Sequence, residues 1–122
     1  MPHRKQKLLL QEGQVMDRLK TMWDIVLERK DHHDEKSYTG YLFESGLDKI
    51  LKKVAEETGE TIIAAKNDDN SALCGEVCDL IYHLFVMMAQ KGLSLEEVLE
   101  ETQTRNEKMG NLKQFKQVDR LS

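Results

Sequence analysis

Acidic side chains recur at helical spacing in two neighbouring stretches of the sequence. The first stretch carries Glu56, Glu57 and Glu60, and the second carries Glu76 and Asp79. Residues three or four positions apart lie on one face of a helix, so each stretch presents a pair of carboxylates to one side. Oxygen ligands without Cys or imidazole favour a hard cation such as Mg²⁺ or Mn²⁺. The spacing therefore indicates a metal site.

The polar segment 67–70 separates the two acidic stretches and predicts a tight connection between two antiparallel helices. Residues 57 and 79 are equally far from residue 68, as are residues 60 and 76. The hairpin therefore sets Glu57 level with Asp79, and Glu60 level with Glu76. These carboxylates would meet across one helix interface and form the predicted metal site, which Glu56 adjoins.

A solvated helix face is the alternative, because lysines at 52, 53 and 66 lie nearby. Two observations favour the metal site. Glu57 falls at the border of the apolar face of its helix, and Glu76 and Asp79 lie in a helix that is apolar almost all round. Unpaired carboxylates beside a core are costly, and like charges at helical spacing repel by roughly 0.2–0.5 kcal/mol per pair.

Two lysines and a histidine extend the predicted site. Lys49 and Lys53 lie on the helix stripe of Glu57, toward the N-terminus, and could hold phosphate groups; an ordinary Lys53–Glu57 surface pair is the alternative. His83 follows Asp79 by four residues and could contact substrate, although a hydrogen-bonded core histidine fits the same position. A Mg²⁺ ion held by carboxylates can bind phosphate oxygens and activate water. These residues indicate chemistry on a phosphate compound.

Periodicity and capping residues predict the helices that position these groups. The chain is expected to begin with a long helix from Val15 to Lys30, followed by a polar loop over 31–36 and a short helix from Tyr38 to Glu44 with Ser37 as N-cap. The next two elements are a helix over 46–66, opened by a Ser45–Asp48 capping box, and a helix from Ser71 to Gln90 that ends at Gly92. The last is a helix from Leu95 to Arg105, opened by a Ser94–Glu97 capping box. The fold class is all-α.

The 122 residues have room for one domain, and 39% of them are hydrophobic. We expect a flexible N-terminal arm over 1–12, the all-α domain over 13–105 and a C-terminal tail over 106–122. Cys74 and Cys78 are interpreted as buried, reduced thiols, because no partner His or further Cys accompanies them at zinc-site spacing.

The net charge of −4 argues against a nucleic-acid or membrane-surface partner. The basic start of the chain precedes too short an apolar run for a signal peptide. The apolar run over 80–89 is interrupted by His83 and is too short to span a bilayer. We therefore expect a cytoplasmic protein that acts on a small molecule.

The helix over 71–90 has apolar residues on more faces than a chain of this size can cover. Self-association about a two-fold axis is the simplest way to cover them. We expect a homodimer or a higher homo-oligomer built around this helix.

The motif Glu56-Glu57-x-x-Glu60 followed by Glu76-x-x-Asp79 resembles the metal motif of the all-α MazG-like and dimeric dUTPase superfamily. Further segments resemble one of its families, the phosphoribosyl-ATP pyrophosphohydrolases of histidine biosynthesis. These segments are 19–29, 37–39, 42–43, 46–54, 63–66, 79–84 and 92–95. The resemblance covers residues 17 to 101.

This resemblance implies a four- to five-helix bundle of the MazG-like type with a central antiparallel hairpin, completed by dimerisation. It implies Mg²⁺-dependent hydrolysis of phosphoribosyl-ATP between its α and β phosphates, giving phosphoribosyl-AMP and pyrophosphate in the second step of histidine biosynthesis. The family's metal and catalytic residues would be Glu57, Glu60, Glu76 and Asp79.

Two other functions stay open at this point. One is a MazG-like or dUTPase-like house-cleaning enzyme that hydrolyses free nucleoside triphosphates; the segment 37–53 favours the histidine-pathway family instead. The other is a helical dimerisation module without catalysis. Retention of the interhelical carboxylates argues against such a module.

Overall fold

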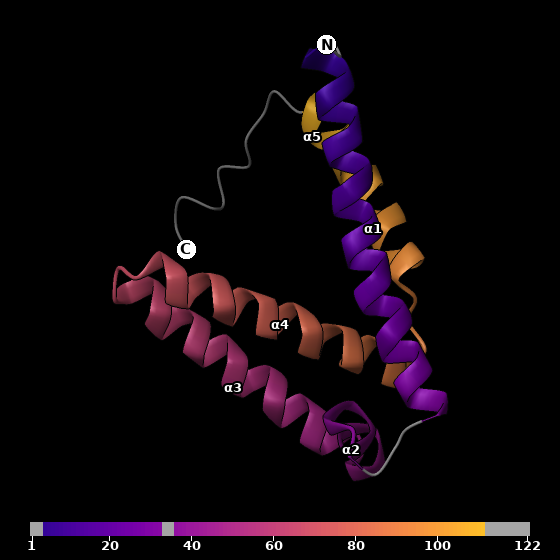
Figure 1. Cartoon of the computed structure of the whole chain (residues 1–122), viewed down its shortest axis with the longest axis vertical. Coiled ribbons are helices and arrows are strands. Elements are labelled where there is room, and N and C mark those ends of the chain that lie inside the picture. Colours follow the sequence, from indigo (N-terminus) through magenta and orange to yellow (C-terminus); the bar gives the residue numbers. More distant parts are fainter. Residues whose placement is uncertain (1–3, 33–35, 112–122) are drawn as a thin grey trace.

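A computed structural model describes residues 4–32 and 36–111 of the chain, and within them it contains five helices and no strand. The helices are α1 (Arg4–Asp31), α2 (Tyr38–Ser45), α3 (Leu47–Lys66), α4 (Asn70–Lys91) and α5 (Leu95–Asn111). Figure 1 shows α3 and α4 as an antiparallel hairpin, with α2 and the end of α1 at its open end. The predicted all-α class and the hairpin are confirmed.

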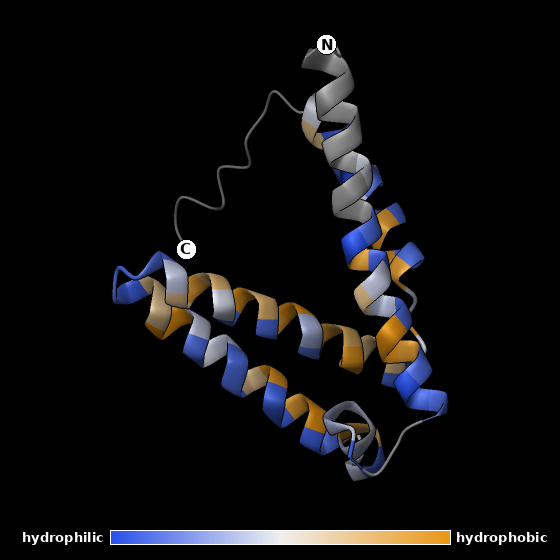
Figure 2. Ribbon diagram, in the orientation of Figure 1, coloured by the Kyte–Doolittle hydropathy of each residue, from blue (hydrophilic) through white to orange (hydrophobic). Residues whose placement is uncertain are grey.

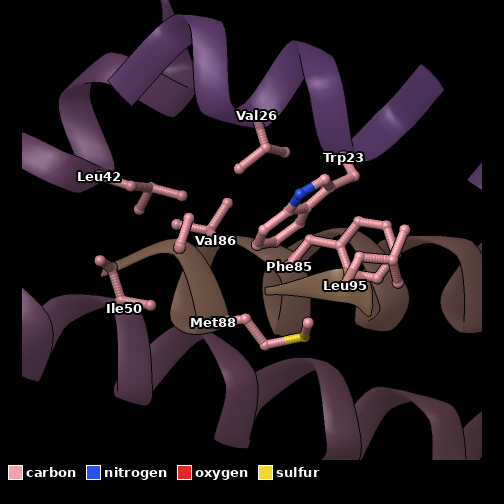
Figure 3. Close-up of a cluster of buried hydrophobic side chains, with 9 residues drawn as sticks. Trp23, Val26, Leu42, Ile50, Phe85, Val86, Met88 and Leu95 are labelled. Carbon is pink, nitrogen blue, oxygen red and sulfur yellow. The ribbon is translucent and has the colours of Figure 1, made fainter. Parts of the chain in front are cut away.

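The hydrophobic core lies at the open end of the hairpin, where four helices meet the second half of α4 (Figure 3). Its buried side chains are Trp23 and Val26 from α1, Leu42 from α2, Ile50 from α3, Phe85, Val86, Met88 and Ala89 from α4, and Leu95 from α5. The rings of Trp23 and Phe85 meet edge to face at 5.5 Å. Because each fully buried large apolar side chain contributes roughly 1.5–3 kcal/mol, this cluster anchors α1, α2 and α5 on the hairpin.

Side chains cap the N-termini of three helices, α2, α4 and α5. The Ser37 hydroxyl accepts a hydrogen bond from the Gly40 N–H and starts α2, as predicted. Asp69 does the same for α4 by accepting from the Ala72 N–H, and Gly92 ends α4 in the left-handed conformation with φ of 75°. The expected capping box at α5 is confirmed, because Ser94 and Glu97 exchange hydrogen bonds of 2.8 and 3.1 Å.

The other predicted capping box was wrong. Ser45 is the last residue of α2, and its hydroxyl donates to the Tyr41 carbonyl oxygen at 2.8 Å. Gly46, with φ of 96°, separates α2 from α3 and serves as the N-cap. This backbone conformation favours glycine, so the chain turns between two helices where the sequence pattern indicated a side-chain cap.

Both end helices are longer than their apolar periodicity indicated. α1 begins at Arg4, within the stretch expected to be an arm, and α5 continues from Arg105 to Asn111. Lys, Gln, Leu and Glu are good helix formers, so helix can extend past the last residue that packs on the core. Residues 1–3, 33–35 and 112–122, which include parts of the expected arm, loop and tail, lie outside the described residues. The division into arm, domain and tail stays a prediction.

The two cysteines are not buried. Cys74 and Cys78 carry free thiols, as expected, but both lie exposed on the first half of α4. Among the described residues, the core cluster takes its α4 members from the second half of the helix, and Cys74 and Cys78 precede that part. The prediction of buried thiols was wrong, because an apolar helix pattern does not say which part of a helix its own chain covers.

Candidate metal centre

The register of the hairpin brings the predicted carboxylates together. Thr61 on α3 places its hydroxyl 2.7 Å from the Glu57 carbonyl oxygen and 3.4 Å from the Glu76 carbonyl oxygen. The hydroxyl thus lies between the two helices at the level of the acids. This register is the one expected from equal distances to the loop.

Three carboxylates form the centre of the cluster. Glu57, Glu76 and Asp79 each place one oxygen so that the three atoms lie within 4.8 Å of one another. Glu57 and Glu76 are half-buried, whereas Asp79 is exposed. Glu60 completes the set, because its carboxylate lies close enough to Glu57 and Glu76 to shift the titration of both.

The environment of the cluster disfavours negative charge. Burial, followed by the Glu60 carboxylate, raises the pKa of Glu57. The same two causes raise the pKa of Glu76. The buried Oε2 atoms of Glu57 and Glu76 accept no hydrogen bond from the described residues. Two carboxylates can hydrogen-bond to each other only if one is protonated, so at neutral pH these contacts are repulsive.

A hard divalent cation fits this donor set. Its members are all carboxylate oxygens, they converge from two helices, and two of them are buried with no donor from the part of the chain that the structure describes. Mg²⁺ and Mn²⁺ prefer such ligands, and a positive ion would remove the repulsion. Next to the cluster, Glu60 and Glu76 also line an open pocket of about 260 Å³ that extends toward the α3–α4 loop. This pocket gives a small ligand access to two of the acids.

Glu56, the fifth predicted ligand, lies apart from the cluster. Its Oε2 lies 3.2 Å from the Lys53 Nζ, and both side chains are partly exposed. The hydrogen bond from Lys53 is the main cause that lowers the pKa of Glu56, and Lys52 and Lys49 lower it further by their charge. The surface pair expected between Lys53 and Glu57 is thus formed with Glu56 instead. Lys49 and Lys53 stand beside the acids, and their contact with phosphate stays a prediction.

His83 is the hydrogen-bonded core histidine that the sequence left as an alternative. It is 5% exposed, and its Nδ1 lies 2.8 Å from the Asp79 carbonyl oxygen. A carbonyl oxygen can only accept, so Nδ1 donates, and Nε2 then accepts from the Tyr38 hydroxyl at 3.1 Å. Both ring nitrogens are therefore occupied within the chain. A contact between His83 and substrate stays a prediction.

Tyr38 is the residue that sequence reasoning missed at this site. It lies at the start of α2, and its ring also contacts Tyr82 and Tyr41. The neighbouring Thr39 hydroxyl bonds to the Tyr82 hydroxyl, so two adjacent residues of α2 hold two adjacent residues of α4. The contacts link residues far apart in the chain, and no local spacing signals them.

Comparison with known proteins places the sequence in a family. Residues 19–106 match the family described as phosphoribosyl-ATP pyrophosphohydrolase. A phosphoribosyl-ATP pyrophosphatase of Clostridium novyi (strain NT) is 49% identical over 98 residues, which cover 80% of this chain and 89% of that protein. The phosphoribosyl-ATP pyrophosphatase of Bacillus cereus (strain AH187) is 45% identical over 100 residues, which cover 82% and 94%.

A third relative carries the matching region as part of a longer chain. The histidine biosynthesis bifunctional protein HisIE of Lactococcus lactis subsp. lactis (strain IL1403) is 54% identical over 90 residues, which cover 74% of this chain and 42% of that protein. The family match over residues 19–106 includes both acidic helices of the hairpin. The chain belongs to the phosphoribosyl-ATP pyrophosphohydrolase family.

Proposed function

We propose that this chain hydrolyses phosphoribosyl-ATP to phosphoribosyl-AMP and pyrophosphate, the second step of histidine biosynthesis. Family membership and relatives named for this activity support the proposal. The observation in the structure that carries it is the cluster of Glu57, Glu60, Glu76 and Asp79, in which two buried oxygens lack a donor. Such a cluster suits a substrate that arrives with phosphates and a cation.

The cofactor that we propose is Mg²⁺, with Mn²⁺ as the other hard cation that these ligands would accept. Glu57, Glu76 and Asp79 would hold it, with Glu60 beside them. When bound, Mg²⁺ would neutralise phosphate charge and lower the pKa of the attacking water. Glu56 contributes to this site through Lys53, which it orients, and not as a ligand.

The bond broken is the anhydride between the α and β phosphates. Water adds to a phosphorus of this anhydride, the bond to the bridging oxygen breaks, the water proton is released, and pyrophosphate separates from phosphoribosyl-AMP. Lys49 and Lys53 lie on α3 toward the open end of the hairpin and would hold phosphate oxygens. Their charge offsets that of the substrate where the carboxylates do not reach.

We further propose that the working unit is a homodimer. The half of the hairpin near the α3–α4 loop carries exposed apolar side chains, Ile62 and Ile63 from α3 and Val77 from α4. Figure 2 shows hydrophobic colour along much of α4 and on α3 close to the loop. A second hairpin packed on this face would cover these side chains and the two thiols.

We place the enzyme in the cytoplasm, as expected from the sequence. α4 is long and apolar enough to cross a membrane by length and composition. It also carries Glu76 and Asp79, and its second half forms the core with α1 and α2. Ionised carboxylates within a bilayer are costly, so these features support a helix of a bundle and not a membrane span.

The direct test is pyrophosphate release measured side by side with phosphoribosyl-ATP, ATP and dUTP at millimolar Mg²⁺. We expect phosphoribosyl-ATP to give the highest kcat/KM. A higher kcat/KM with ATP or dUTP would favour a house-cleaning enzyme. No release from any of the three would overturn the enzymatic function.

A further inference from the structure

Tyr38 is an exposed aromatic side chain that a buried histidine holds in place. The residue is 45% exposed, yet its hydroxyl is bonded to Nε2 of His83, whose other nitrogen is bonded to the backbone of α4. The His83 and Tyr38 rings meet edge to face at a centroid distance of 6.0 Å, and the Tyr82 ring stacks on Tyr38 at a centroid distance of 6.4 Å. Three rings, those of Tyr41, Tyr82 and His83, therefore surround the Tyr38 ring, and almost half of the residue stays exposed to solvent.

This ring lies one helical turn from the carboxylates. His83 follows Asp79 by four residues on α4, and Lys53 precedes Glu57 by four on the antiparallel α3. Each step corresponds to roughly 6 Å along a helix. The Tyr38 hydroxyl is hydrogen-bonded to His83, so it lies at the level of that residue. It is also close enough to Lys53 and Glu57 for their charges to act on it. Tyr38 thus closes the end of the site toward α2.

We propose that Tyr38 is a substrate-contacting residue whose open ring surface stacks on the adenine base of the nucleotide. The inference rests on the proposed function, in which the carboxylates hold the phosphates. In a nucleotide, the ribose and then the base follow the phosphates. With the phosphates at the carboxylates and the base directed toward α2, the ribose and the base reach the level of Tyr38.

The chemistry of Tyr38 favours a flat ligand over a charged one. Its hydroxyl is already bonded to His83, so the ring is what remains for a ligand. Aromatic side chains stack on nucleobases, and a ring that is already fixed loses little freedom on binding. Tyr41 is the natural comparison, because it lies on the same helix and is 49% exposed, but His83 does not bond to its hydroxyl.

The test compares three variants: Tyr38→Leu removes the ring, Tyr38→Phe keeps the ring and removes the hydroxyl, and Tyr41→Leu is the matched control. Steady-state kinetics with phosphoribosyl-ATP should show KM raised on the order of tenfold for Tyr38→Leu. Tyr38→Phe should stay within a few-fold of wild type, and so should Tyr41→Leu, because Tyr41 contacts the Tyr38 ring but its loss leaves the bond between Tyr38 and His83 in place. If Tyr38→Leu does not fold, Tyr38→Met takes its place.

A binding measurement separates stacking from a structural role. Calorimetric titration with AMP, which carries the base, and with inorganic pyrophosphate, which does not, is done in Mg²⁺ buffer. Tyr38→Leu should raise the Kd of AMP about tenfold and leave the Kd of pyrophosphate unchanged. An equal loss of affinity for both ligands would overturn the stacking role of Tyr38. So would an equal KM for Tyr38→Leu and Tyr41→Leu in an active enzyme, and neither result would bear on the proposed function. A wild-type protein that does not hydrolyse phosphoribosyl-ATP would overturn the proposed function and this inference with it.

Discussion

The Thr61 hydroxyl lies between two backbone carbonyl oxygens, that of Glu57 on its own helix and that of Glu76 on the facing helix, 3.4 Å away. This contact marks the level at which α3 and α4 approach each other. A slip of one residue in either helix would turn its acids by about 100° away from the facing pair. The proposed metal site therefore depends on the register of the hairpin.

The first prediction is that Mg²⁺ stabilises the folded protein. A cation that binds only the native state adds RT ln(1 + [L]/Kd), about 2.7 kcal/mol at a concentration 100 times Kd. Scanning calorimetry at pH 7.5 should show a higher midpoint with millimolar Mg²⁺ than with EDTA. Asp79→Asn should reduce this difference. An unchanged midpoint in the wild-type protein would contradict the site.

The second prediction concerns the pH dependence without metal. Burial and Glu60 raise the folded-state pKa values of Glu57 and Glu76 above their unfolded values. A carboxyl group whose pKa is higher in the folded than in the unfolded state lowers the free energy of unfolding at pH values above its unfolded-state pKa. This destabilisation disappears as the pH falls through the folded-state pKa, because the group is then protonated in the folded protein. In EDTA, the midpoint should therefore rise as pH is lowered from 7.5 into the range of these raised pKa values.

The control for this pH effect is a variant without the repulsion. In Glu57→Gln/Glu76→Gln the rise on mild acidification should be lost. In the wild type, Mg²⁺ should raise the midpoint most at neutral pH and least where the carboxyls are protonated. A midpoint in EDTA that falls steadily from pH 7.5 downward would mean that repulsion between the carboxylates does not destabilise the fold.

The third prediction uses two adjacent glutamates. Glu57→Gln should lower kcat/KM on the order of 100-fold or more, the loss typical when an electrostatic group of an active site is removed. Glu56→Gln should have a much smaller effect, because Glu56 lies outside the cluster and pairs with Lys53 at the surface. Circular dichroism should show unchanged helix content in both. Equal losses in the two variants would contradict the different roles.

The roles of these two glutamates show what a sequence pattern can predict. Equal spacing from a short loop predicts which residues of two antiparallel helices are level, and the cluster follows from it. The pattern does not fix whether Glu56 or Glu57 joins the cluster, because the first is four and the second three residues from Glu60, and both spacings share a helix face. The Tyr38–His83 bond joins residues 45 apart and depends on how α2 packs on α4. Only tertiary structure determines it.

The capping residues show a second limit. A Ser followed three residues later by an acid occurs at both Ser45 and Ser94, but only Ser94 forms a capping box. A serine hydroxyl can bond forward to cap the next helix or backward to a carbonyl of the preceding one. Since α2 ends directly at Ser45, the backward bond is formed there.

The fourth prediction follows from the capping box that does form. Ser94→Ala should destabilise the protein by about 0.5–2 kcal/mol, as for other lost N-caps. Hydrogen bonds from Ser94 lower the pKa of Glu97. A carboxyl group whose pKa is lower in the folded than in the unfolded state stabilises the fold at pH values above its unfolded-state pKa. This stabilisation is lost as the pH falls through the folded-state pKa.

Denaturant unfolding at several pH values checks this linkage. Glu97→Gln should be less stable than wild type at pH 7, and the difference should shrink below pH 4. Glu96→Gln is the matched control, because Glu96 is an exposed acid in the same first turn of α5. Equal effects of the two substitutions at pH 7 would contradict the capping role.

The last prediction is that the face near the α3–α4 loop joins two copies of the chain. Ile63 is 60% exposed there, and a buried isoleucine contributes roughly 1.5–3 kcal/mol, so a charge at this position should weaken the dimer strongly. Light scattering at micromolar concentration should give twice the chain mass of 14.2 kDa for wild type and one chain mass for Ile63→Glu. Met109→Glu is the control, because Met109 is 70% exposed on α5, away from this face. A wild-type mass of one chain, or loss of the dimer in the Met109 variant alone, would contradict the proposed interface.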